Sequence, residues 1–278
     1  MKKFNVGLQL YGVRNAMKED FEGTLRAVRE MGYDYVEFAG YFDRSAEEIA
    51  RLLDEIGLKC ISVHQGLDFF DDDPLAAIKY LKTFGVKYSV VPWYDKNMLA
   101  GTDGWEKTKK HFSEMADLFC ENGMKLGYHN HDFEFEKFEG KTLHDHIFEA
   151  IDADKIEPQF DVCWVRYAGH DPAEWIRKYN GRVNIVHLKD FVCKKLASGP
   201  VYDLIDANGN NLGTVSREDN GFEFRPLGDG MQDFAPILKA CEECGTETFI
   251  VEQDRSYDLP ELVAAKRSRD YLKNTFGI

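Results

Sequence analysis

The feature that most constrains the fold is a unit that recurs along the whole chain. It consists of a stretch with helical apolar spacing, a glycine, and a short run rich in β-branched and aromatic residues. Five runs carry the glycine, at residues 31–38, 56–64, 84–93, 122–131 and 244–253. Three more fit the strand pattern alone, at 4–10, 156–162 and 182–188. Because the glycine stands where a helix C-cap is expected, each unit is predicted to be a helix followed by a strand.

Eight strands that alternate with helices predict a parallel α/β architecture. For a chain of 278 residues the closed (β/α)8 or TIM barrel fits best, and a doubly wound open sheet is the alternative. No composition break or linker divides the sequence, so we expect a single domain over residues 1–278. The irregular stretch at about 191–229 contains an Asn-Gly pair, which predicts a hairpin inserted in the loop after the seventh strand.

Charge and composition exclude several classes of partner. The chain has 35 Lys and Arg against 49 Asp and Glu, a net charge of −14, which argues against nucleic-acid and anionic-membrane surfaces. No apolar run is long enough to span a membrane, and Asn5 and Gln9 interrupt the N-terminal apolar stretch. Cys60, Cys120, Cys163 and Cys193 are scattered and suit reduced, buried thiols, and the single C-x-x-C of Cys241 and Cys244 is only a weak zinc signal. We therefore expect a cytoplasmic protein.

The alternation of side chains along each strand, called strand parity below, predicts that polar residues face the barrel interior. Alternate side chains of a barrel strand face the helices and the interior, and the apolar ones, such as Val36 and Phe38, are expected to face the helices. Strict alternation in the third strand also turns Cys60 and Ser62 inward. The inward polar residues at or near the strand ends are Gln9, Glu37, His64, His129, His131, Asp161, His187, Lys189 and Glu252. Burying so many without a function would be costly, and barrel active sites lie at this rim.

The chemistry of this set indicates a metal site. Asp161, His187 and Glu252 supply mixed oxygen and nitrogen donors, and residues 129–134 offer a further carboxylate or imidazole. Such a set suits Mn²⁺, Mg²⁺, Co²⁺ or Zn²⁺, and the lack of thiolates disfavours a structural zinc site. A partly buried or metal-bound glutamate could also act as a general base.

The sequence resembles the sugar phosphate isomerase/epimerase family of xylose-isomerase-like barrels. The resemblance is carried by GLQLYGVR (7–14), YHNHDFEF (128–135), QFDVCW (159–164), VHLKD (186–190), PLGDG (226–230) and IVEQD (250–254). Family members bind one divalent metal through a Glu, an Asp, a His and a second Glu. The resemblance implies that Asp161, His187 and Glu252 hold three of these positions, with Mn²⁺ as the first choice of cation.

The fourth ligand is where this sequence departs from the family pattern. The sugar epimerases have their metal glutamate where this chain has His129. Glu134 is ranked first as its replacement, followed by His129 and His131. We expect Glu252 to exchange the substrate proton, with His129 or Glu134 opposite it. The epimerases also commonly have a histidine where Trp164 stands here.

The resemblance implies a divalent-metal-dependent sugar isomerase or epimerase that abstracts a proton beside the carbonyl of a keto-sugar. The alternative is a dehydratase or lyase that acts on a keto-inositol or keto-glycoside by the same enediolate chemistry. A metal-free sugar-binding or partner subunit is a further alternative. We expect a small-molecule sugar as the partner, and the sequence leaves a homo-oligomer open. DNA repair of the endonuclease IV type is disfavoured by the net charge.

The remaining candidates concern substrate contacts. Lys189 and Arg255 could offset the charge of substrate oxygens, and Trp93, Phe133 and Trp164 either stack on a sugar face or simply pack. The other expected substrate contacts are Gln9, Glu37, His64 and His131. The backbone N–H groups of PLGDG (226–230) either bind an anion or only form a tight turn.

Overall fold

The computed structural model describes residues 4–196, 217 and 219–278. Its eight long strands close into a barrel in the order β1-β12-β9-β8-β5-β4-β3-β2, and every pairing in it is parallel. The barrel strands are β1 (Asn5–Gln9), β2 (Tyr35–Phe38), β3 (Lys59–His64), β4 (Tyr88–Val91), β5 (Lys125–His129), β8 (Ile156–Asp161), β9 (Ile185–Leu188) and β12 (Thr248–Val251). The predicted (β/α)8 barrel is therefore confirmed, and the open sheet is excluded.

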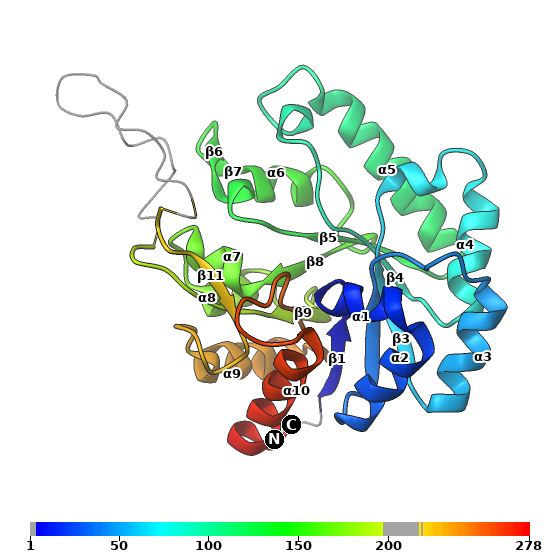
Figure 1. Cartoon of the computed structure of the whole chain (residues 1–278). Coiled ribbons are helices and arrows are strands. Elements are labelled where there is room, and N and C mark those ends of the chain that lie inside the picture. Colours follow the sequence, from blue (N-terminus) through cyan, green and yellow to red (C-terminus); the bar gives the residue numbers. More distant parts are fainter. Residues whose placement is uncertain (1–3, 197–216, 218) are drawn as a thin grey trace.

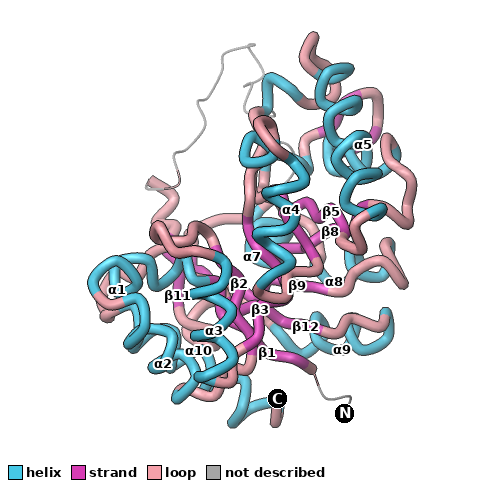
Figure 2. Tube along the Cα trace, turned by 90° about the vertical axis from the view of Figure 1, so that its right-hand side faces the viewer, coloured by secondary structure: helices cyan, strands magenta, loops and turns pink. Residues whose placement is uncertain are grey.

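Helices surround these strands on the outside, as Figures 1 and 2 show from two directions. They are α1 (Arg14–Glu19), α2 (Phe21–Glu30), α3 (Ala46–Ile56), α4 (Pro74–Thr83), α5 (Trp105–Glu121), α6 (Leu143–Glu149), α7 (Val162–Tyr167), α8 (Pro172–Lys178), α9 (Phe234–Cys244) and α10 (Glu261–Tyr271). The α3 helix shows how the sequence sets their limits. It begins with a capping box between Ser45 and Glu48 and ends at Gly57, whose φ is +77°. None of the described helices has the length and apolar character needed to cross a bilayer.

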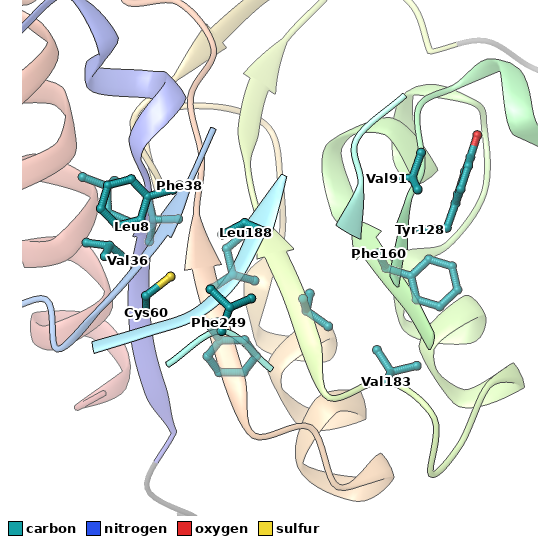
Figure 3. Close-up of a cluster of buried hydrophobic side chains, with 14 of the residues drawn as sticks. Leu8, Val36, Phe38, Cys60, Val91, Tyr128, Phe160, Val183, Leu188 and Phe249 are labelled. Atoms are coloured by element: carbon teal, nitrogen blue, oxygen red, sulfur yellow. The ribbon is translucent and has the colours of Figure 1, made fainter. Parts of the chain in front are cut away.

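The main core lies between the strands and the helices. Outward side chains such as Leu8, Val36, Phe38 and Phe249 pack there with almost no exposure (Figure 3). Since these residues occupy the outward positions that parity predicts, the polar residues between them face the barrel interior.

The third strand departs from strict alternation. Between β2 and β3 the register shifts, so that Val36 pairs with Cys60 while Glu37 pairs with Ser62. The shift adds one residue, Ile61, to β3. Cys60 consequently packs in the outer core beside Val36 (Figure 3), and its predicted inward position is wrong. Ser62 and His64 retain theirs, because they lie beyond the irregularity.

Two small antiparallel pairs stand outside the barrel. The first joins β6 (Lys137–Phe138) to β7 (Lys141–Thr142), and the second joins β10 (Asp190–Val192) to β11 (Glu223–Arg225). The second pair lies within the stretch predicted as an insertion at about 191–229. The hairpin expected around its Asn-Gly pair lies outside the described residues.

Candidate active site

Four side chains meet at the carboxyl ends of four neighbouring strands. His129 ends β5, Asp161 ends β8, His187 belongs to β9, and Glu252 follows β12. Each offers one donor atom, and the four atoms lie within 4.8 Å of one another. All four residues are almost completely buried, with exposures of 0–4%. We call these four residues the donor cluster.

Asp161 is oriented by the start of the next helix. As the N-cap of α7, it accepts hydrogen bonds at Oδ1 from the backbone N–H groups of Cys163 (2.8 Å) and Trp164 (3.3 Å). Asn130 also fixes its backbone, since Asn130 Oδ1 accepts from the Asp161 N–H at 3.0 Å. Oδ2 has no hydrogen-bond partner among the described residues and is the oxygen that approaches His129 and Lys189. Burial raises the pKa of Asp161 to about 7.

His187 lies between two carboxylates. Its Nδ1 donates to Glu252 Oε2 at 2.8 Å, and its Nε2 donates to Glu37 Oε1 at 2.7 Å. Burial alone would lower its pKa, but the charges of Glu37 and Glu252 raise the pKa of His187 to about 10. Since Glu37 holds Nε2, Nδ1 is the nitrogen that His187 presents to the donor cluster.

Glu37 lies beneath the donor cluster and is fully buried. Its carboxylate accepts hydrogen bonds from Gln9, Ser62, Gln159 and His187. Burial would raise its pKa, but the neighbouring His64 and His187 and these hydrogen bonds lower the pKa of Glu37 to about 2. Gln9 and Glu37, which the sequence suggested as substrate contacts, do not line the cavity; Glu37 holds His187, and Gln9 donates to Glu37.

Lys189 places a positive charge beside the donor cluster. Its Nζ lies 3.2 Å from Asp161 Oδ2, 3.2 Å from Glu252 Oε2 and 2.7 Å from Asp254 Oδ1. Burial would lower its pKa, but these carboxylates raise the pKa of Lys189 well above its usual value. In turn, Lys189 and His187 overcome the burial of Glu252 and hold the pKa of that carboxyl well below its usual range. Glu252 is therefore ionised and Lys189 is protonated near neutral pH.

A cavity of about 440 Å³ opens above these residues. Such a volume accommodates a small polyhydroxylated molecule. The cavity is lined by Tyr11, Ala39, His64, Pro92, Trp93, His129, His131, Lys189, Glu252 and Asp254. Exposed aromatic rings of Tyr11 and Trp93 therefore share one chamber with the ionisable groups. Of the expected substrate contacts, the cavity is lined by His64, Trp93, His131 and Lys189.

Three other residues predicted as substrate contacts do not line the cavity, although Trp164 and Phe133 pack against its wall at His131. Trp164 is 2% exposed and stacks on Phe222, with ring centroids 5.4 Å apart. Phe133 stacks on His131 rather than lining the cavity. Arg255 lies over the ring of Tyr257, at 4.9 Å from its centroid.

Glu134 is not among the described residues that gather their donor atoms in the cluster. It lies in a short 3-10 turn, Phe133–Phe135, where its carboxyl group accepts hydrogen bonds from the Tyr128 hydroxyl (2.9 Å) and the His131 N–H (2.7 Å). Burial raises the pKa of Glu134 to about 8, so this carboxyl holds its proton at neutral pH. In this structure His129 fills the cluster position for which the sequence ranked Glu134 first.

The PLGDG loop (226–230) forms a ring of N–H groups around an internal anion. The N–H groups of Gly228 and Gly230 donate to Asp190 Oδ2 at 2.9 and 3.1 Å, and the Gln232 N–H donates to Oδ1 at 3.0 Å. Gly228 has a φ of +85°, and a Cβ at Gly230 would come within 2.2 Å of Asp190 Oδ1. The loop is thus an anion site, and Asp190 of the same chain occupies it.

Residues of the site that escaped the sequence reasoning include Gln159, Asp254, Asp190 and the cavity-lining Tyr11. Gln159 stands two positions before Asp161 on the same strand, so parity alone could have placed it inside the barrel. Asp254 and Asp190 follow strand ends and carry no comparable signal.

Relatives with assigned names cover most of the chain. An inosose dehydratase from Geobacillus kaustophilus is 26% identical over 281 residues, covering 90% of this chain and 85% of the relative. An inosose dehydratase from Clostridium perfringens is 25% identical over 276 residues, covering 91% of this chain and 89% of the relative.

Solved structures share the fold. A sugar phosphate isomerase/epimerase from Parabacteroides distasonis superimposes with a TM-score of 0.77 at 20% identity, covering 99% of this chain and 96% of its own. The IOLI protein, solved with a bound zinc atom, superimposes with a TM-score of 0.69 at 17% identity, covering 99% of this chain and 100% of its own. The family model described as "Xylose isomerase-like TIM barrel" matches residues 25–275. Because this match spans most of the sequence, the chain belongs to the xylose isomerase-like TIM barrel family.

Proposed function

We propose that this protein is a divalent-metal-dependent lyase that removes water from a keto-inositol or a related keto-sugar. The observation that carries the proposal is the donor cluster beside a cavity of about 440 Å³, at the strand ends where barrel enzymes hold their active sites. The names of the relatives, which match over about nine tenths of the chain, support dehydration over isomerisation. Both outcomes begin with removal of a proton beside a carbonyl.

The donor cluster fits a divalent cation. His129 Nε2, Asp161 Oδ2, His187 Nδ1 and Glu252 Oε2 would hold it once His187 has lost its Nδ1 proton. The buried Asp161 Oδ2, which pairs with the Lys189 charge but accepts no hydrogen bond among the described residues, supports this assignment. Two imidazoles with two carboxylates suit Mn²⁺, Co²⁺ or Zn²⁺ better than Mg²⁺, which prefers oxygen ligands. When bound, such a cation supplies Lewis acidity that makes a C–H bond beside a substrate carbonyl more acidic.

Glu252 is the proposed base. It lines the cavity and is ionised, and with Oε2 directed at the cation its Oε1 would be left to receive the proton. The protonated Lys189 would donate a hydrogen bond to the substrate oxygen that gains charge. Glu252 could then return its proton to the departing hydroxyl group, which leaves as water. The rings of Tyr11 and Trp93 would cover the apolar face of the substrate.

The proposal is tested with protein purified without chelators. Metal analysis should find about one divalent ion per chain, and a set of keto-inositols and keto-glycosides should be incubated with Mn²⁺ in D₂O. Mass spectrometry is expected to show a product that has lost one water. Deuterium uptake without loss of water would identify an epimerase or isomerase instead. Saturable sugar binding with neither metal nor turnover would identify a binding protein.

A further inference from the structure

A buried glutamine connects three members of the site. Gln159 lies in β8, two residues before Asp161, and is 2% exposed. Its Oε1 is 3.0 Å from His129 Nδ1 and 2.7 Å from His64 Nε2. Its Nε2 donates to Glu37 Oε2 at 2.7 Å. All the polar atoms of this amide are therefore engaged, although Gln159 does not line the cavity.

The hydrogen-bond partners of Gln159 determine which way its side-chain amide is oriented. Glu37 is ionised and can only accept hydrogen bonds, so the NH₂ group of Gln159 must face it. The amide oxygen then faces the two histidines, and an amide oxygen can only accept. Both histidines must therefore donate an N–H to Gln159, His129 from Nδ1 and His64 from Nε2.

This orientation determines which nitrogen of His129 carries the lone pair. A neutral imidazole has one N–H group, and Gln159 holds that of His129 on Nδ1. Nε2 is then unprotonated, and it is the nitrogen that lies 3.6 Å from Asp161 Oδ2 and 3.9 Å from Glu252 Oε2. The opposite tautomer would direct an N–H group into the donor cluster and an unpaired nitrogen at the Gln159 oxygen.

We propose that Gln159 is a positioning residue, which fixes the Nδ1–H tautomer of His129 and so presents the Nε2 lone pair to the cation. The cation itself rests on the function proposed above, but the tautomer does not. Gln159 acts through His129 and contacts neither the cavity nor the donor atoms of the other three cluster residues. Groups that orient a ligand in this way typically contribute 10- to 100-fold to metal affinity.

The first test is direct and needs no variant of Gln159. Nitrogen-15 NMR of metal-free protein labelled at its eight histidines reports which ring nitrogen is protonated, and a His129→Gln variant assigns the His129 signals. We expect a pyrrole-type Nδ1 and a pyridine-type Nε2. A protonated Nε2 in a neutral ring would overturn the proposal.

The second test measures cation affinity. Gln159→Met retains most of the side-chain volume but removes the amide, and Mn²⁺ titration calorimetry should show 10- to 100-fold weaker binding. The matched control is Gln232→Met. Gln232 is also buried, but its side-chain amide donates to the Val162 carbonyl and does not contact a histidine among the described residues. Equal Mn²⁺ affinity in wild type and Gln159→Met would overturn the proposal. Absence of Mn²⁺ binding to wild type would instead refute the proposed function, and the NMR result would still decide the tautomer.

Discussion

Substitution of Glu134 separates two roles that the sequence could not distinguish. The family pattern ranked this residue first as the fourth metal ligand. In the structure its carboxyl group instead accepts hydrogen bonds from the Tyr128 hydroxyl and the His131 N–H, and it is fully buried. Glu134 is thus expected to hold the loop that carries His131, and its loss should affect stability before it affects metal binding.

The expected loss in the free energy of unfolding follows from the two hydrogen-bond donors. Glu134→Leu leaves the Tyr128 hydroxyl and the His131 N–H without their acceptor, at about 1–3 kcal/mol for each stranded buried donor. The free energy of unfolding should therefore fall by about 2–6 kcal/mol, a large part of the roughly 5–15 kcal/mol that stabilises a typical domain. Glu134→Gln should cost little, because burial already keeps this carboxyl protonated at neutral pH; the amide oxygen can accept from the His131 N–H while the amide NH₂ donates to the Tyr128 hydroxyl oxygen.

Urea unfolding of metal-free protein measures the stability, and Mn²⁺ calorimetry measures the affinity. Glu134→Gln is expected to bind Mn²⁺ as tightly as wild type does. His129→Gln, the matched substitution inside the donor cluster, is expected to lose binding. The reasoning is refuted if Glu134→Gln loses the ion at unchanged stability while His129→Gln keeps it, since the carboxylate would then be the ligand.

Further predictions concern the cation, the base and a histidine outside the site. Asp161→Asn should abolish binding of the Mn²⁺-like ion in calorimetry while the circular dichroism spectrum stays unchanged, and full occupancy would contradict the assignment. Glu252→Gln, assayed at saturating Mn²⁺, should lower kcat by about 10² to 10⁴, and wild-type deuterium exchange in this variant would point to another base. Stripping the cation with a chelator should lower the free energy of unfolding, by about 2.7 kcal/mol relative to protein at a free ion concentration of 100 Kd, and an unchanged urea midpoint would argue against a bound ion. Burial lowers the pKa of His144 to about 3, so the unfolded chain binds more protons between about pH 3 and 6.5. The free energy of unfolding should therefore decrease as the pH is lowered through that window, by at most about 1.4 kcal/mol per pH unit from this residue. His144→Phe should reduce this pH dependence in urea titrations.

Alternation along the strands was enough to predict the barrel and most of its inward residues, because one side of each strand packs in a continuous apolar core. It failed at Cys60, where the register between β2 and β3 shifts by one residue. Ile61 and Cys60 are both apolar, so composition gives no sign of the extra residue. A bulge of this kind is visible only once the partner strand is known.

Positions beyond strand ends were harder to predict for a different reason. Strand alternation does not predict the direction of a side chain in a turn. The position of the Glu134 carboxyl depends on a hydrogen bond from the hydroxyl of Tyr128, a residue of the outer core. Gln159 obeyed parity but was passed over, because an amide is neither a metal ligand nor a base. Residues that orient ligands have ordinary polar side chains, so only the hydrogen-bond geometry reveals them.

The ring of N–H groups around Asp190 has a consequence for molecules that reach this loop from solution. Its anion is attached to the same chain, at the start of β10, so its effective concentration at the ring far exceeds that of any free anion. A phosphate group would have to displace a neighbour that cannot diffuse away. The N–H groups of Gly228 and Gly230 therefore form an anion-binding loop that the Asp190 side chain of the same chain already occupies. Asp190→Ala should unblock it, and the affinity of that variant for formate or acetate would measure how strongly the fold itself attracts an anion there.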